Sequence, residues 1–216
     1  MTKKLFWKDP FLTQIETHIT RVKDNDITVE QTIFYALSGG QESDAGTIGN
    51  KSVLQARKEE KEIVYTLKNG HGLKPGDPVT MMIDWERRYQ LMRLHFAAEI
   101  VLELVYRTLD SIKKIGAHIA QDKARIDFEW AENISKVFPV IQKEALRIIE
   151  ANQEIMSAFS DEETEKRYWK ISEFSQVPCG GTHLKRTGEI GGIELTRKNL
   201  GKGKERIEIY VSENSM

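Results

Sequence analysis

The chain has 216 residues and carries 32 basic and 33 acidic side chains, so its formal net charge of -1 gives no overall sign of a nucleic-acid binder. One cysteine excludes an internal disulfide and indicates a reducing compartment, for which the cytoplasm is our expectation. No signal-peptide pattern and no apolar run of about eighteen residues occurs, so we expect a soluble protein with no membrane partner.

Residues 1–84 alternate apolar and polar side chains between turn residues, which is typical of strands. The stretches "KDND" and "KNGHG" suit hairpin turns, and "LKPGDPVTMMID" suits a turn that leads into a last strand. We predict a small N-terminal β-barrel domain over residues 1–84, with a boundary near Asp84.

A glycine-rich stretch, "FYALSGGQESDAG", places Gly39, Gly40 and Gln41 in a turn of this first domain. It lacks the ending of a phosphate-binding loop. Two readings remain open: a tight hairpin, or a backbone surface that approaches a substrate or the neighbouring domain.

Residues 85–114 contain neither proline nor glycine and repeat apolar side chains at helical spacing, which predicts a long, mostly buried helix that ends at Gly116. "AHIAQDKARIDFEW" predicts two short strands. Residues 131–168 are predicted to be helical but broken or bent near Pro139, and the remainder to form a hairpin with a basic glycine turn. Strands followed by mixed elements indicate an α+β class and a second domain over residues 85–216.

"LHFAAE" places His95 and Glu99 one helical turn apart, so their side chains point the same way and could share a metal ion. The alternative is a solvated, salt-bridged stripe, because Glu103 and Arg107 continue the four-residue interval.

"QVPCGGTH" places Cys179 and His183 on a loop in which Gly180 and Gly181 let the backbone wrap closely around an ion. Sulfur and imidazole are ligands that zinc prefers, whereas the alternative is a buried structural cysteine beside a surface histidine. A combined set of His95, Glu99, Cys179 and His183 with one carboxylate favours a catalytic site over a structural zinc.

Further polar residues have weaker patterns. Gln121 could hydrogen-bond a substrate or a water, or be an ordinary exposed glutamine. Basic side chains that could touch phosphates, or simply face solvent, are Lys123, Arg125, Arg197, Lys198, Lys202 and Lys204.

Five motifs, taken in order, resemble those of a known family, the editing domain of alanyl-tRNA synthetase and its free-standing AlaX relatives. They are "FYALSGGQESDAGTI", "LHFAAE", "GAHIAQDKARIDF", "CGGTH" and "TGEIGGIELTRKNLGKGKERIEIY". Together they span nearly the whole chain, and the chain resembles the medium-sized stand-alone form. Two positions depart from the family pattern: Glu99 stands where histidine is usual, and Ala98 where many members carry threonine.

The resemblance implies a two-layer α/β editing domain of the alanyl/threonyl-tRNA synthetase type after the barrel. It implies a hydrolase that deacylates tRNA(Ala) carrying a wrong amino acid, chiefly serine and perhaps glycine, with one Zn²⁺ per chain. His95, Cys179 and His183 match the family's ligands directly, and Glu99 would be the fourth. We assign Gln121 a catalytic role, and expect substrate contacts from Gly39, Gly40, Gln41, Ala98, Gly180 and Gly181.

Two other functions remain open. A tRNA-binding module with a structural or decayed zinc site is motivated by the departures at Ala98 and Glu99. A zinc-stapled interaction protein without RNA has only the near-neutral charge in its favour. No obligate protein partner is implied.

Overall fold

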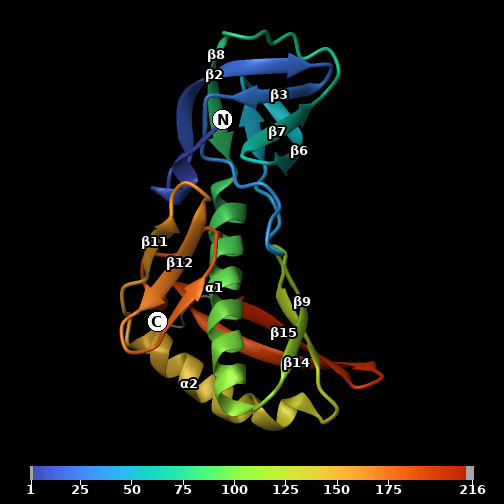
Figure 1. Cartoon of the computed structure of the whole chain (residues 1–216), viewed down its shortest axis with the longest axis vertical. Coiled ribbons are helices and arrows are strands. Elements are labelled where there is room, and N and C mark those ends of the chain that lie inside the picture. Colours follow the sequence, from blue (N-terminus) through green and yellow to red (C-terminus); the bar gives the residue numbers. More distant parts are fainter. Residues whose placement is uncertain (1, 213–216) are drawn as a thin grey trace. The chain divides into compact units, whose positions relative to one another are not determined.

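The computed structural model describes residues 2–212, and the chain divides into two compact units, Met1–Tyr89 and Gln90–Met216. Each unit is described by itself. The class is mixed α and β with more strand than helix (Figure 1). The expected boundary residue, Asp84, directly precedes a helix, and the domain limits of 1–84 and 85–216 stay predictions.

The regular elements of the first unit are nearly all strands. Six of them pair in the order β2-β3-β7-β6-β5-β8, and β8 pairs back to β2, so the sheet closes into a ring. The short strands β1 and β4 form a separate parallel pair. The bounds are β1 Lys3–Lys4, the 3₁₀ turn Leu5–Trp7, β2 Gln14–Lys23, β3 Asp26–Val29, β4 Gln31–Thr32, β5 Gly46–Ile48, β6 Lys51–Glu59, β7 Glu62–Leu67 and β8 Pro78–Ile83.

Side chains along these strands point alternately to the two faces of the sheet, and those on one face form a common core. Ile27, Tyr65 and Met81 are almost fully buried there, since side chains of a strand point to opposite faces in turn. The predicted hairpin at "KDND" is confirmed, because β2 and β3 pair across it. The hairpin at "KNGHG" is wrong: this stretch follows β7, which pairs with β3 and β6, and leads through a long connection to β8.

Helix α1 spans Trp85–Thr108, and the second unit begins within it at Gln90. Asp84 caps its first turn by accepting the Arg87 backbone N–H at 3.1 Å. The predicted end at Gly116 is wrong. The helix stops earlier, Ser111 turns the chain with a φ of 62°, and Gly116 lies in strand β9 opposite Asp127. No helix among residues 2–212 is long and apolar enough to cross a membrane.

Up to residue 212, the second unit contains two antiparallel sheets. Its four-stranded sheet has the order β14-β15-β10-β9, and its three-stranded sheet has the order β11-β12-β13. The predicted strand pair around "QDK" and the closing hairpin are therefore confirmed. The bounds are β9 Lys113–Ile119, β10 Ala124–Glu129, β11 Met156–Asp161, β12 Lys166–Ile171, β13 Ser175–Pro178, β14 Gly192–Gly201 and β15 Lys204–Ser212.

The predicted helix over residues 131–168 is wrong for most of its length. Helix α2 covers only Phe138–Glu150, after a 3₁₀ turn at Ile134–Val137, and a third 3₁₀ turn lies at Thr187–Ile190. A break near Pro139 is confirmed, because the 3₁₀ turn ends at Val137 and α2 begins at Phe138. Pro139 stands in the first turn of α2, where its missing N–H needs no intrahelical partner. Asn152, with a φ of 45°, follows the end of α2 and leads towards β11.

Candidate functional site

His95 and Glu99 lie one turn apart on α1, as predicted from their spacing. His95 Nε2 is 3.3 Å from Glu99 Oε1, and the histidine is 5% exposed. The second carboxylate oxygen, Oε2, accepts a hydrogen bond from the indole Nε1 of Trp169 at 3.2 Å. Both side chains therefore point into the second unit.

The same face of α1 also contacts the three-stranded sheet further along the helix, and α1 runs beside β12 in Figure 1. Glu103 Oε2 accepts a hydrogen bond of 2.6 Å from Ser175 Oγ at the start of β13. Arg107 donates to the carbonyl oxygen of Phe174 and lies 4.4 Å from the centre of its ring. Glu99, Glu103 and Arg107 thus contact the β12–β13 segment. Glu99 and Glu103 are partly buried, so of the three only the exposed Arg107 fits the alternative of a solvated stripe.

Cys179 and His183 come from the loop that follows β13. The Cys179 backbone N–H donates to the Arg167 carbonyl oxygen at 2.9 Å, which extends the pairing of β13 with β12. The chain then turns inward through Gly180 and Gly181, and His183 is 4% exposed. His183 Nδ1 is 2.8 Å from Ser157 Oγ, which leaves Nε2 directed at Cys179 Sγ, 3.3 Å away.

The two half-sites converge. His95 Nε2 lies 3.2 Å from Cys179 Sγ, although 84 positions separate the residues in sequence. The ligand atoms of His95, Cys179 and His183 all lie within 4.8 Å of one another. These three residues could hold a metal ion, and Glu99 Oε1 lies against the same group.

The spacing of these atoms fits a small tetrahedral cation. Zinc bonds of about 2.3 Å to sulfur and about 2.0–2.1 Å to nitrogen or oxygen put N···S pairs about 3.6 Å and N···O pairs about 3.4 Å apart. The two N···S distances are 3.2 and 3.3 Å, and the N···O distance is 3.3 Å. These three pairs are close to the spacing that such an ion requires, whereas Glu99 is not among the residues whose ligand atoms all lie within 4.8 Å of one another.

The electrostatics of the cluster favour a positive charge at its centre. Burial disfavours the imidazolium of His95, but Cys179 and Glu99 outweigh burial and raise its pKa to about 10. Burial, together with His95 and Arg167, holds the pKa of His183 well below its usual value. The groups beside His95 therefore favour a positive charge in the cluster, which a bound cation would also supply.

Arg167, Trp169 and Ser157 complete the surroundings of the cluster, and the sequence interpretation missed all three. Trp169 is directly opposite Ser157 in the β11–β12 pairing, so both side chains stand on one face of the sheet. Arg167 is 5% exposed and donates to the Gly181 carbonyl oxygen at 3.3 Å. The alternation of Arg167, Trp169 and Ile171 in "KRYWKI" is the signal that indicates a half-buried strand.

In the first unit, Gly39 and Gly40 form a tight turn. Ser38 and Gln41 exchange backbone hydrogen bonds of 3.0 and 3.2 Å across them, and both glycines have a positive φ, 60° and 88°. Such a turn needs glycine at its centre. The hairpin reading of this stretch is therefore correct, whereas contact with a substrate stays a prediction.

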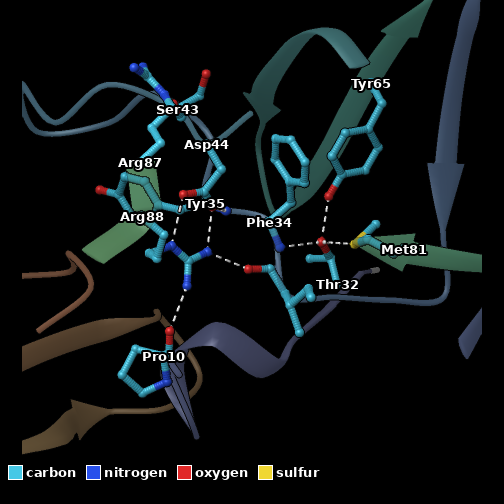
Figure 2. Close-up of polar contacts among 11 residues, drawn as sticks. Pro10, Thr32, Phe34, Tyr35, Ser43, Asp44, Tyr65, Met81, Arg87 and Arg88 are labelled. Atoms are coloured by element: carbon cyan, nitrogen blue, oxygen red, sulfur yellow. Dashed lines mark hydrogen bonds and ion pairs between the residues drawn. The ribbon is translucent and has the colours of Figure 1, made fainter. Parts of the chain in front are cut away.

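The segment after this turn is held by a buried ion pair (Figure 2). Arg88 and Asp44 have side chains with no exposed surface; Arg88 Nε donates to Asp44 Oδ1 at 2.8 Å, and a second bond joins Nη2 to Oδ2. Arg88 also donates to the carbonyl oxygens of Ile33 and Pro10 at 2.6 and 2.8 Å. The Tyr35 backbone N–H donates to Asp44 at 2.6 Å. We call this group the Arg88 clamp.

The remaining predicted residues have different surroundings. Gln121 is exposed in the turn between β9 and β10, and Ala98 is 6% exposed within α1. Three of the basic residues form ion pairs: Lys123 with Glu208, Arg125 with Asp127 and Arg197 with Glu205. Lys198, Lys202 and Lys204 are exposed near the tip of the β14–β15 hairpin. The roles of all these residues stay predictions.

Comparisons with known proteins agree with the resemblance drawn from the motifs. A family described as the threonyl and alanyl tRNA synthetase second additional domain matches residues 167–208, which include Cys179 and His183. The chain is 34% identical to an alanyl-tRNA editing protein AlaX-M of Pyrococcus horikoshii over 215 residues, with 98% of each chain covered. It is 32% identical to an AlaX-M of Methanosarcina acetivorans, covering 96% of this chain and 98% of the relative. It is also 30% identical to an alanine–tRNA ligase of Methanococcus aeolicus, of which it covers 26%.

Proposed function

Because the chain belongs to the AlaX-type family of stand-alone alanyl-tRNA editing proteins, we propose that it deacylates tRNA(Ala) carrying a wrong amino acid. The observation that carries the proposal is the convergence of His95 and Cys179 from distant elements to 3.2 Å. In this interpretation the closed ring of strands is the small barrel of the family, and residues 85–216 are the two-layer editing domain.

We propose Zn²⁺ as the resident ion, held by His95, Cys179, His183 and Glu99. Their nitrogen, sulfur and oxygen donors are the set that zinc prefers, and the His95–Cys179, His183–Cys179 and His95–Glu99 distances are close to those that its bond lengths imply. When bound, zinc supplies a Lewis acid that polarises a carbonyl or a water.

In this proposal the side chains around the site position the metal ligands and the substrate and exclude water. Ser157 fixes which nitrogen of His183 faces the cluster. His95 and His183 are buried, so Cys179 and the Gly180 backbone form the more exposed side of the site. An aminoacyl ester is already reactive, so orienting it against a fixed site accounts for a large part of the rate. Gln121 is our proposed hydrogen-bond donor to the oxygen that becomes negatively charged.

We propose serine as the chief amino acid removed, with glycine as a second substrate. A site that hydrogen-bonds the serine hydroxyl rejects alanine, because its methyl group would leave a buried polar group without a partner. Gly39, Gly40, Gln41, Ala98, Gly180 and Gly181 are the proposed substrate contacts, and the exposed lysines Lys198, Lys202 and Lys204 the proposed phosphate contacts, with Lys123, Arg125 and Arg197 as neighbours.

The experiment is a deacylation assay with seryl-, glycyl- and alanyl-tRNA(Ala) side by side. We expect hydrolysis of the seryl ester, its loss on removal of zinc with a chelator, and its return on adding Zn²⁺. Cys179→Ala should lower the rate at least about 100-fold with an unchanged circular dichroism spectrum. Gln176→Ala, an exposed position on the neighbouring β13, is the matched control and should keep the normal rate.

A second candidate function rests on Glu99, which stands where the family usually has histidine. In that case the protein binds tRNA(Ala) but does not turn it over at any metal concentration. Normal tRNA binding together with no hydrolysis of any of the three esters would favour this binding module and reject the deacylase.

A further inference from the structure

Trp169 has one polar atom, and that atom contacts the candidate metal centre. The side chain is fully buried between Phe96, whose ring centre is 5.2 Å away, and Phe174, at 6.4 Å. Its Nε1 donates to Glu99 Oε2 at 3.2 Å. Indole is a donor only, so this hydrogen bond has one direction.

Because of this hydrogen bond, the two carboxylate oxygens of Glu99 have different partners. Oε2 is engaged by the indole, while Oε1 lies 3.3 Å from His95 Nε2, on the side of Cys179 and His183. A free carboxylate on a helix can rotate, and either oxygen or both could then face the cluster. With Oε2 held, only Oε1 faces it.

The neighbouring strand has a matching arrangement. Ser157 lies opposite Trp169 in the sheet, and its Oγ contacts His183 Nδ1 at 2.8 Å. These two neighbouring side chains therefore orient two candidate metal ligands, His183 on the loop and Glu99 on α1. Groups that bond the far side of a metal ligand fix its orientation and usually raise the metal affinity about 10- to 100-fold.

We propose that Trp169 is a positioning residue that makes Glu99 a one-oxygen metal ligand in place of a histidine. This inference rests on the metal centre of the proposed function but concerns a residue that no part of that proposal uses. The competing explanation is structural: a buried indole N–H needs an acceptor, and Glu99 provides one. The structural explanation predicts a loss of stability in Trp169→Phe without a loss of metal affinity.

The test is a double-mutant cycle on metal binding, measured without RNA by titrating the metal-free protein with Zn²⁺ and Co²⁺ against a competing chelator. Trp169→Phe removes the N–H and keeps an aromatic ring, and we expect it to weaken binding about 10- to 100-fold. Trp130→Phe, in the same unit, is the matched control and should leave the affinity unchanged. In a Glu99→Ala background, Trp169→Phe should have no further effect, because its partner is gone.

A spectroscopic readout keeps the proposal testable even if Trp169→Phe folds poorly. The chain has four tryptophans, so Trp7→Phe, Trp85→Phe and Trp130→Phe together leave Trp169 as the only indole. We expect the emission of that protein to change when Zn²⁺ binds and to be quenched by Co²⁺.

Four results would overturn the inference: equal affinity of Trp169→Phe and Trp130→Phe, additive effects of Trp169→Phe and Glu99→Ala, an indole emission indifferent to metal, or a wild-type protein that binds no metal. The titration does not depend on hydrolysis. A protein that passes the cycle but deacylates nothing would lose its proposed function and keep this role of Trp169.

Discussion

Replacing Arg88 by methionine is expected to lower the free energy of unfolding of the first unit by about 3–5 kcal/mol. The Arg88 clamp is fully buried, and its guanidinium makes bonds to Asp44 and to the carbonyl oxygens of Ile33 and Pro10. Methionine fills similar space but donates nothing. Asp44 would keep only its bond from the Tyr35 N–H and would become a buried charge without a counter-ion.

The magnitude follows from burial rather than from the ion pair itself. Arg57 and Asp26, in the same unit, form a comparable pair with a distance of 2.6 Å, but their side chains are 34% and 33% exposed. Solvent screens that pair, so Arg57→Met should cost no more than about 1 kcal/mol. The double variant Arg88→Met with Asp44→Leu should recover part of the loss, because no charge is left buried.

Urea unfolding of the three variants and the wild type, followed by fluorescence and circular dichroism, measures these differences. The reasoning is refuted if Arg88→Met costs as little as Arg57→Met, or if the double variant is less stable than Arg88→Met alone. Either result would mean that Asp44 finds other partners or is neutral in the folded protein.

Three further predictions concern acid stability, backbone packing and RNA binding. Burial opposes ionisation of Asp127, but Arg206 and Arg125 hold the pKa of its carboxyl below the usual 3.8. The stability that these partners contribute is therefore present above about pH 4 and lost as the pH falls through the pKa of the folded protein. The urea midpoint should fall less steeply with acid in Asp127→Asn than in the wild type, and equal slopes would contradict this. Gly46→Ala places a Cβ 2.1 Å from a carbonyl oxygen of β8 and should cost about 2 kcal/mol or more by urea unfolding, whereas Gly180→Ala meets nothing within 4 Å and should stay within about 0.5 kcal/mol. If the chain binds tRNA through its hairpin, Lys198→Gln should reduce the slope of log affinity against log salt by about 1 in filter-binding assays, and Arg197→Gln, whose partner is an acidic side chain, by less.

Local patterns predicted those parts of the molecule that depend on neighbours in sequence. The spacing of four between His95 and Glu99, and the glycines after Cys179, indicated two half-sites, and each half is formed as expected. Their convergence to 3.2 Å could not be derived from periodicity, because it depends on how α1 packs against a sheet some 70 residues later. The two halves were joined on the kind of donor atoms they carry, and the resemblance to a family then supported that combination.

The errors have physical reasons as well. The stretch "SDEETEKRYWKI" is rich in glutamate and lysine, which favour helices, but its inward alternation of Arg167, Trp169 and Ile171 decided for a strand once a sheet was available to pair with. Gly116 resembled a helix stop but lies within β9, where it pairs with Asp127 of β10. Tertiary pairing overrode local preference at both places.

The four-residue interval on α1 also limits how the gene for this protein can change in length. His95, Glu99, Glu103 and Arg107 reach their partners only because one turn of helix returns each to the same side. A single inserted codon between the first and the last would rotate every later side chain by about 100° and detach several contacts at once. An added codon at the tip of the β14–β15 hairpin would lengthen only an exposed turn, so length variants should accumulate there and be purged from the helix.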